Sequence, residues 1–309
     1  MKTIQTSQNR WLHAYATCLA CATFLLIIAG ALVTSNDAGL SVPDWPTSFG
    51  TFRMPRMVGG VLYEHGHRMI AATVGLLTVI LAVWVWLKEP RRWVRWVSGA
   101  AVLAVIAQGV LGGITVLFYL PVVVSVGHAT LAQSFFSTTV SLAFFSRADW
   151  RWDEGKIEDL SAPSLRQLSV MTSAAILLQL VLGAAFRHNG IGVVPHIVVA
   201  LAVTLLVTWT VTRVFTKFSS QRRLVRLARA LAGLLAVQLF LGIGAYLMKL
   251  AARNAPQPLP PVVNVTTAHV AVGALVLATS VVLALHVFRF VATPRRAPSL
   301  REASQKAAA

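Results

Sequence analysis

Apolar residues along the chain fall into eight long runs, separated by short segments rich in polar and basic residues. A helix needs roughly 20 apolar residues to cross the hydrocarbon core of a bilayer. The runs therefore predict eight transmembrane helices, over residues 14–34, 61–87, 97–119, 122–145, 167–186, 192–214, 228–249 and 262–288. The first run is too long and too weakly bounded for a cleaved signal peptide, so we expect it to remain as the first helix.

The composition supports the same class of protein. Hydrophobic residues make up 56% of the chain and charged residues only 12%, whereas a soluble domain is about 25% charged. This excludes a disordered chain, a disulfide-rich secreted domain and an ordinary cytosolic enzyme, and leaves an all-α integral membrane protein. The two cysteines, Cys18 and Cys21, both lie in the first run, which excludes an outer-loop disulfide and a cysteine metal site.

The positive charge of the chain is unevenly distributed between the two sides. Lys and Arg number 27 against 10 Asp and Glu, and most of them lie in the tails and after the second, fourth and sixth runs. Because cytoplasmic loops are enriched in Lys and Arg, we expect both termini in the cytoplasm, in a bacterial-type cell membrane. The net charge of +17 then reflects topology and contact with lipid, and predicts no nucleic acid partner.

A short pattern recurs on the odd-numbered runs. The third, fifth and seventh runs read QGVLGG from Gln108, QLVLGA from Gln179 and QLFLGI from Gln238, and the first reads LIIAGA with Leu26 in place of Gln. The glycine four residues after each glutamine shares its face, and helix packing is the simplest explanation of such small residues in lipid. The recurrence predicts two pseudo-symmetric four-helix bundles, residues 1–150 and 151–309, from a duplicated unit.

Each even-numbered run carries a histidine shortly after its start: His67, His128, His196 and His269. These runs cross the membrane in the same direction, so we expect the four imidazoles at similar depth. Two histidines on different helices in each half are what bis-imidazole ligation of haem iron needs, and an ionisable residue inside a span indicates function. There are three alternatives: a structural role in which the histidines bond to backbone carbonyls in the core, a non-haem metal site, and a proton pathway.

The start of the second run places Glu64, His67 and Arg68 on one helix face, because they are spaced i, i+3 and i+4. An ion pair between Glu64 and Arg68 at a helix N-terminus is the structural interpretation. A carboxylate beside a ligated haem, active in proton delivery or reaction, is the functional interpretation. Both can hold together.

The outer side carries further candidate contacts. The loop over residues 37–50 holds two prolines and several turn-forming residues, which predicts an ordered cap. Asp44 and Trp45 in this loop are candidates for the outer mouth of a site, although Trp45 is also typical of a membrane interface. Outer basic residues such as Arg187 could hold haem propionates or lipid headgroups.

Taken together, these segments resemble the haem A synthase family. GLSVPDWP over 39–46 is similar to the first outer-loop motif of that family, and EHGHR over 64–68 to its Glu-x-x-His-Arg segment. The other three histidine segments are matched by GHATLA at 127–132, PHIVVA at 195–200 and AHVAVG at 268–273. The combination is specific and spans all eight runs.

The resemblance implies an enzyme that oxidises the C8 methyl of haem O to a formyl group, by two successive hydroxylations and loss of water, to give haem A for terminal oxidases. It implies that His67 and His128, in the 1–150 half, flank the substrate haem. It assigns a resident haem b, for electron transfer, to His196 and His269 in the 151–309 half. Glu64 would be the catalytic carboxylate.

The same resemblance extends to the surroundings of the site. Asp44, Trp45, Arg68 and Arg187 become candidates for contacts with haem propionates or the outer mouth. Haem O synthase and an electron donor are the expected partners, and a homo-oligomer is compatible with the family.

One departure and two rival functions qualify this interpretation. Some bacterial members carry a cysteine pair in the first outer loop, where this chain has Val42. If that pair serves as a redox relay in those members, this protein must do without it. A dihaem cytochrome b that only transfers electrons is the main rival, but it usually places haems at two depths. A transporter with parallel repeats would need broken helices and polar residues at the midplane, and the sequence offers few.

Overall fold

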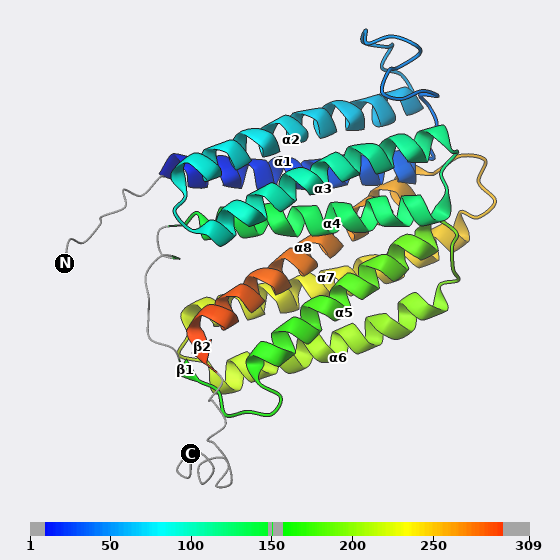
Figure 1. Ribbon diagram of the computed structural model, residues 1–309. Helices are drawn as coiled ribbons and strands as arrows, with labels where there is room; N and C mark the ends of the chain where they lie inside the picture. The colour runs from blue at the N-terminus through cyan, green and yellow to red at the C-terminus, as the bar shows by residue number, and fades with distance from the viewer. Residues whose placement is uncertain (1–9, 148–149, 151–156, 293–309) are drawn as a thin grey trace, which may run out of the picture.

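The computed structural model describes residues 10–147, 150 and 157–292. In these residues the chain forms eight long helices and two very short strands (Figure 1). The helices are α1 (Arg10–Ser35), α2 (Gly60–Lys88), α3 (Arg92–Leu117), α4 (Val122–Phe145), α5 (Leu165–Arg187), α6 (Val194–Lys217), α7 (Arg222–Ala251) and α8 (Pro260–Phe290). Each predicted run corresponds to one helix, so the prediction of an all-α membrane protein is confirmed.

Seven of the eight helices are long and apolar enough to cross a membrane, and α4 is not among the seven. This helix owes its lower hydropathy to buried polar residues, among them Gln133, Ser137, Thr139 and Ser141. Its 24 residues are roughly 36 Å long, and it lies alongside the other helices (Figure 1). The eighth crossing of the membrane stays a prediction for α4.

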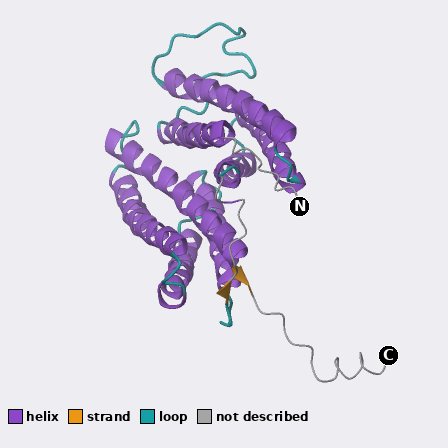
Figure 2. Cartoon of the chain, turned by 90° about the vertical axis from the view of Figure 1, so that its left-hand side faces the viewer, coloured by secondary structure: helices purple, strands orange, loops and turns teal. Residues whose placement is uncertain are grey.

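The helices pack as consecutive hairpins, α1 with α2, α3 with α4, α5 with α6 and α7 with α8. Contacts of α1 with α4 and of α5 with α8 close two groups of four, and α1 and α4 meet α5 and α8 between the groups. Figures 1 and 2 show the two groups side by side. Each group lies within one of the predicted halves, and the duplication that would relate the halves stays a prediction.

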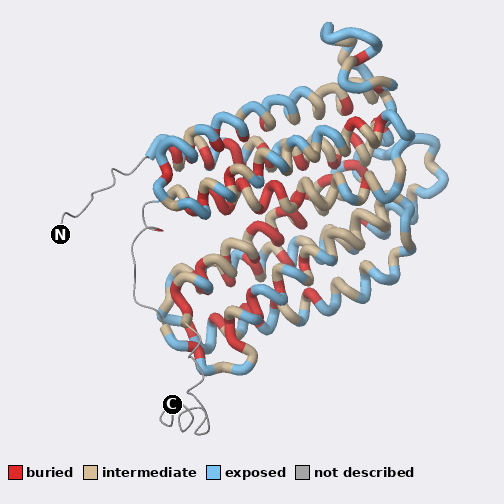
Figure 3. The backbone as a smooth tube through the Cα atoms, viewed as in Figure 1, coloured by how far each residue is buried: buried red, intermediate tan, exposed pale blue. Residues whose placement is uncertain are grey.

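Each group has its own apolar core, and a third, smaller cluster lies where the two groups meet. In α8, 56% of the most apolar stretch is buried, against 11% in α7, which makes α8 a central helix (Figure 3). Ile27 of α1, Phe136 of α4 and Ala274 of α8 form one apolar cluster across the groups. Outward faces carry exposed apolar residues such as Leu103, as expected where the surroundings are lipid tails.

A small polar structure ties the start of the second group to its end. Strand β1 (Ile157–Glu158) pairs in parallel with β2 (Val291–Ala292) directly after α8. The Asp159 carboxylate then accepts the backbone N–H of Leu165 at 2.5 Å, at the first turn of α5. Burial alone would raise the pKa of Asp159, but this bond and those from Ser161 outweigh it and lower that pKa. The contact fixes where α5 begins.

Candidate functional site

The four candidate histidines share one packing arrangement. In every hairpin the imidazole lies against a glycine of the preceding helix. A Cβ atom built on that glycine would lie between 2.9 and 3.4 Å from the imidazole Cε1, for the pairs Gly30 and His67, Gly112 and His128, Gly183 and His196, and Gly242 and His269. The glycines attributed to helix packing therefore also make room for the imidazoles.

The second group brings its two histidines close together. The ring centroids of His196 and His269 lie 6.4 Å apart, and the ring planes are inclined by 76°. A bond from a metal to an imidazole nitrogen is about 2 Å long, so two axial imidazoles on one iron have ring centres about 6 Å apart. The spacing of His196 and His269 fits an iron atom between them.

Histidines of both groups have a ring nitrogen without a hydrogen-bond partner. The Nδ1 atoms of His67, His128 and His269 are buried and have no hydrogen-bond partner. A buried polar atom left unpaired is costly, and such an atom in a native structure calls for an explanation. In the first group the corresponding histidines are His67 on α2 and His128 on α4. The donor set suits ligation by neutral imidazole nitrogens, so the residues fit haem.

Glu64 and Arg68 together hold the loop over residues 37–50 on α2. Glu64 is only 4% exposed. Its Oε1 accepts from Arg68 at 2.6 Å and its Oε2 accepts the backbone N–H of Val42 at 2.7 Å. Arg68 also donates to the carbonyl oxygens of Val42, Asp44 and Thr47, at 3.2, 2.7 and 3.1 Å. The ion pair expected from the spacing is present, and it fastens the loop above His67.

Asp44 and Trp45 give this loop its fixed shape, as expected for an ordered cap. The Asp44 carboxylate accepts from the Thr47 hydroxyl and from the backbone N–H groups of Phe49 and Gly50. These bonds, first that from Thr47, hold the pKa of Asp44 below its usual value. The Trp45 indole packs against α3 at Gly113, where a Cβ would lie 2.7 Å from the ring.

Arg187 lies at the junction of the two groups. It donates at 2.9 Å to the carbonyl of Ala31 and at 2.7 Å to the Ser35 hydroxyl, both in the last turn of α1. A cation at a helix C-terminus is favourable. The neighbouring His188 has its pKa lowered by burial and then by the charge of Arg187, so its imidazole is neutral at neutral pH. Arg187 therefore joins the groups close to the histidines.

Three glutamines on the odd-numbered helices contact the histidines, a role that their spacing alone did not predict. In the structure, the amide nitrogens of Gln108 and Gln179 each donate, at 2.9 Å, to the backbone carbonyl of the histidine on the next helix. The amide nitrogen of Gln238 lies 3.4 Å from Nε2 of His269. The signal that could have found them was the constant spacing of glutamine and glycine on the odd-numbered helices.

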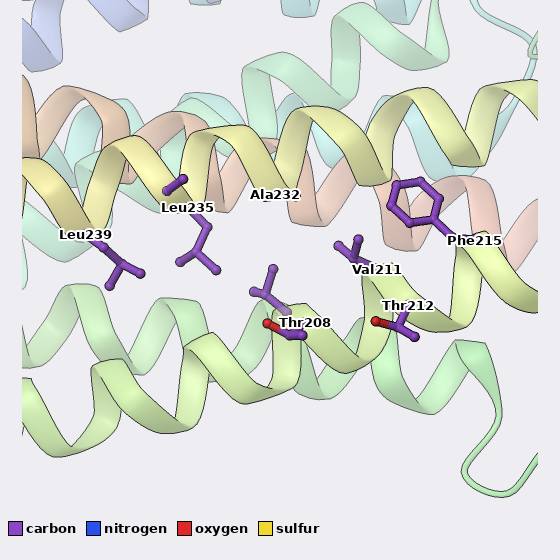
Figure 4. A pocket seen from close by; sticks show the side chains of 9 residues that line it. Thr208, Val211, Thr212, Phe215, Ala232, Leu235 and Leu239 are labelled. Atoms are coloured by element: carbon purple, nitrogen blue, oxygen red, sulfur yellow. The ribbon is translucent and has the colours of Figure 1, made fainter.

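A separate cavity lies between α6 and α7, with a volume of about 310 Å³. Apolar residues such as Val211, Phe215 and Leu239 line it (Figure 4). It begins at Val207, roughly three helical turns beyond His196 on α6. The cavity is therefore not part of the histidine site.

The fold and the paired histidines define a multi-pass, all-α membrane protein whose hairpins each hold one histidine against a glycine. Residues 58–196 match the model of a family described as cytochrome oxidase assembly protein, COX15-CtaA. That segment includes Glu64, His67 and His128 and ends at His196. His269 lies beyond it.

Several relatives carry the name Heme A synthase. The one from Halalkalibacterium halodurans is 31% identical over 44% of each chain, and the one from Lysinibacillus sphaericus is 32% identical over 36% of each chain. The one from Symbiobacterium thermophilum is 31% identical over 58% of this chain and 60% of the relative. The matched part thus spans less than two thirds of these relatives. The chain is related to the haem A synthases, and the resemblance predicted from its motifs is confirmed.

Proposed function

We propose that this protein is a haem A synthase that converts the C8 methyl group of haem O to a formyl group. The conversion adds one oxygen, removes two hydrogens and is a four-electron oxidation. The observation that carries the proposal is the presence of two histidines packed on glycines in each helix group, with the buried carboxylate of Glu64 one turn before His67. The names of the relatives support the same activity.

The two halves would have different functions, electron transfer in one and catalysis in the other. His196 and His269, with ring centres 6.4 Å apart, hold a resident haem b, which supplies one-electron transfer when bound. His67 and His128 flank the substrate haem O in the first half. The second half has Val193 and Val194 near His196, where the first half has Glu64 near His67. This difference supports one catalytic half and one electron-transfer half.

Glu64 is the proposed catalytic carboxylate, and its contacts limit how it acts. Both of its oxygens are already bonded, one to Arg68 and one to the backbone of Val42. Glu64 therefore keeps the outer loop closed over the substrate half while it is ionised. A proton taken up by Glu64 would remove the negative charge that pairs with Arg68, so proton movement and opening of the loop would be linked.

The residues around the outer mouth orient the substrate in this proposal. Arg187, at the junction of the groups, and Arg68, beneath the loop, supply positive charge for propionates. Asp44 and Trp45 act by shaping the cap. The protein would reside in a bacterial cell membrane with both termini in the cytoplasm, in contact with lipid, with haem O synthase and an electron donor as partners. A homo-oligomer is compatible with this proposal.

A dihaem cytochrome b that only moves electrons is the second candidate function. All four histidines lie within the first three turns of α2, α4, α6 and α8, which supports two haems at one depth. Transfer of electrons across the membrane needs haems near both faces. The buried Glu64 near His67 also has no counterpart near His196, a difference that a symmetric electron carrier does not explain.

The deciding experiment is extraction of haem from the purified protein, produced together with a haem O source, followed by chromatography and mass measurement. We expect haem B together with haem O, hydroxylated haem O or haem A. Haem B alone at two per chain would favour the cytochrome. A protein that folds but contains no haem would contradict ligation by these histidines.

A further inference from the structure

We propose that the Gln-x-x-x-Gly segments of α3, α5 and α7 are seats that set the orientation of the imidazoles facing them. Each seat consists of a glutamine and the glycine four residues later, on the helix face that meets the next helix of the hairpin. The inference deepens the proposed function, because it rests on ligation of haem by His128, His196 and His269. It makes the glutamines positioning residues.

The glycine of each seat receives the ring edge. At Gly183 and Gly242 an added Cβ would lie 2.9 Å from the imidazole Cε1, a distance too short for real atoms. At Gly112 the corresponding distance is 3.4 Å, an ordinary contact. The rings of His196 and His269 are therefore pressed against the backbone of α5 and α7, and rotation of either ring towards that helix is blocked.

The glutamine of each seat limits how the histidine can move relative to the facing helix. The Gln179 amide nitrogen donates to the carbonyl of His196 at 2.9 Å and lies 3.0 Å from its Nδ1. The Gln108 amide makes the same bond to the carbonyl of His128. A side chain that bonds the backbone of the histidine on the facing helix fixes how far the two helices can slide or rotate relative to each other. Ring and backbone of His196 are thus held from α5, while on α7 the amide nitrogen of Gln238 approaches the ring of His269, at 3.4 Å from Nε2.

The glutamines are not optimal residues for packing alone. The Oε1 atoms of Gln179 and Gln238 are buried and have no hydrogen-bond partner. A buried unpaired acceptor destabilises a fold, and two apolar residues of similar shape would avoid that loss. Retention of an amide at both positions is explained if its donor side is needed at the histidine.

The first hairpin departs from the pattern. Gly30 faces His67 with an added Cβ 3.0 Å from Cε1, but Leu26 occupies the glutamine position. His67 therefore faces a glycine, but no glutamine amide lies at the position four residues before that glycine. Both proposed haem b ligands, His196 and His269, therefore face complete seats. The incomplete seat faces His67, in the substrate half.

The test uses the purified full-length protein with its haem b and three substitutions on α7. Gly242→Ala places a methyl group where the ring of His269 lies, and we expect it to lose at least half of the haem b per chain. Gln238→Leu keeps the volume and removes the amide, and we expect haem b to stay bound with altered ligand orientation. Gly233→Ala is the matched control, because a Cβ there meets nothing within 4 Å.

The decisive readout is the electron paramagnetic resonance signal of low-spin ferric haem, because its g-values depend on the angle between the two axial imidazole planes. With planes inclined by 76°, the unmodified protein is expected to give a strongly anisotropic signal with a large g maximum. Gln238→Leu should shift that maximum, and Gly233→Ala should leave it unchanged. A signal and haem content unchanged in both Gln238→Leu and Gly242→Ala would overturn the inference.

Failure of the inference and failure of the proposed function give different results. His269→Ala removes the ligand itself and should abolish the low-spin signal. If that signal survives His269→Ala, ligation by His269 is wrong and the proposed function fails with it. If the signal disappears in His269→Ala but neither seat variant changes it, ligation stands and the seats are wrong. Gln238→Leu keeps the test valid where Gly242→Ala does not fold.

Discussion

At the scale of single residues, Glu64 has a structural role and a proposed catalytic one, and the two are compatible. It is a structural partner of Arg68, at 2.6 Å, and a buried carboxylate three residues before His67. A substitution that keeps its shape separates the roles, because glutamine can still accept from Val42 but cannot pair as an anion with Arg68.

We expect Glu64→Gln to retain haem b, since His196 and His269 belong to the other helix group, and to lower haem A formation at least tenfold. Loss of the charged hydrogen bond should cost about 1.5–3 kcal/mol of stability. The ratio of haem A to haem O in extracts measures the first effect, and thermal unfolding measures the second. Glu158→Gln, at an exposed carboxylate, is the control. Unchanged haem A production would show that Glu64 is only a structural partner of Arg68.

The residues that the sequence predicted differ in kind from those that it missed. A histidine or glutamate inside an apolar run is visible because burial of an ionisable group is expensive. A glycine is ambiguous, because spacing shows which residues share a face but not which neighbour that face meets. The contact of Gly183 with His196 depends on the rotation of α5 and α6 about their own axes, which only the folded structure fixes.

At the scale of elements, the cap over residues 37–50 behaves as an ordered unit. Proline and turn-forming residues predicted its order, but its anchoring points required the structure. Glu64 and Arg68 bind its backbone from α2, and Trp45 packs against α3 at Gly113. The cap thus joins the first and second hairpins above the histidines of the first group.

The cap should respond to acid through Asp44. Its pKa is lowered by the bonds from Thr47, Gly50 and Phe49, so the ionised form stabilises the loop at every pH above the ordinary range of an aspartate. This contribution is lost as the pH falls through the lowered pKa of the folded protein. We therefore expect the loop to stay ordered at neutral pH and to loosen only in strong acid.

Amide hydrogen exchange at Phe49 and Gly50, corrected for intrinsic rates, measures this directly. Asp44→Asn should raise exchange at both amides at neutral pH, because a neutral side chain is a weaker acceptor, and should remove most of the dependence on acid. Exchange of the Val42 amide, which Glu64 holds, is the internal control and should change less. Equal exchange in the two proteins would show that Asp44 does not hold the cap.

At the scale of the whole molecule, the question is how the two groups of helices are placed in the membrane. Helices α1 and α4 contact α5 and α8 across the junction. Arg187 and Ser35 bond there, and Ser35 also contacts Thr266 and Thr267 of α8 at 3.0 and 3.2 Å. Polar bonds between helices stabilise association in lipid where apolar contacts offer little preference, so these bonds favour one fixed arrangement of the two groups.

The crossing of the membrane by α4 decides the topology. If α4 crosses, the chain spans the membrane eight times and both termini lie on one side. If it does not, everything after α4 is inverted, and the basic residues at Arg213, Lys217 and Arg222 move to the outer side, against the usual distribution of charge. The polar residues of α4, such as Gln133, are buried among its neighbours, so they do not oppose insertion as lipid-facing residues would.

We therefore predict that α4 crosses, and reporter fusions test it. A fluorescent protein that matures only in the cytoplasm, fused after Ala309, should be fluorescent. Alkaline phosphatase inserted into the connection between α7 and α8, near Pro256, should be active, because that connection would face outwards. Inverted results at both positions would mean that α4 does not cross. The four histidines would then lie at opposite faces of the membrane in the two groups, which is the arrangement of an electron-transfer cytochrome and not that of the proposed synthase.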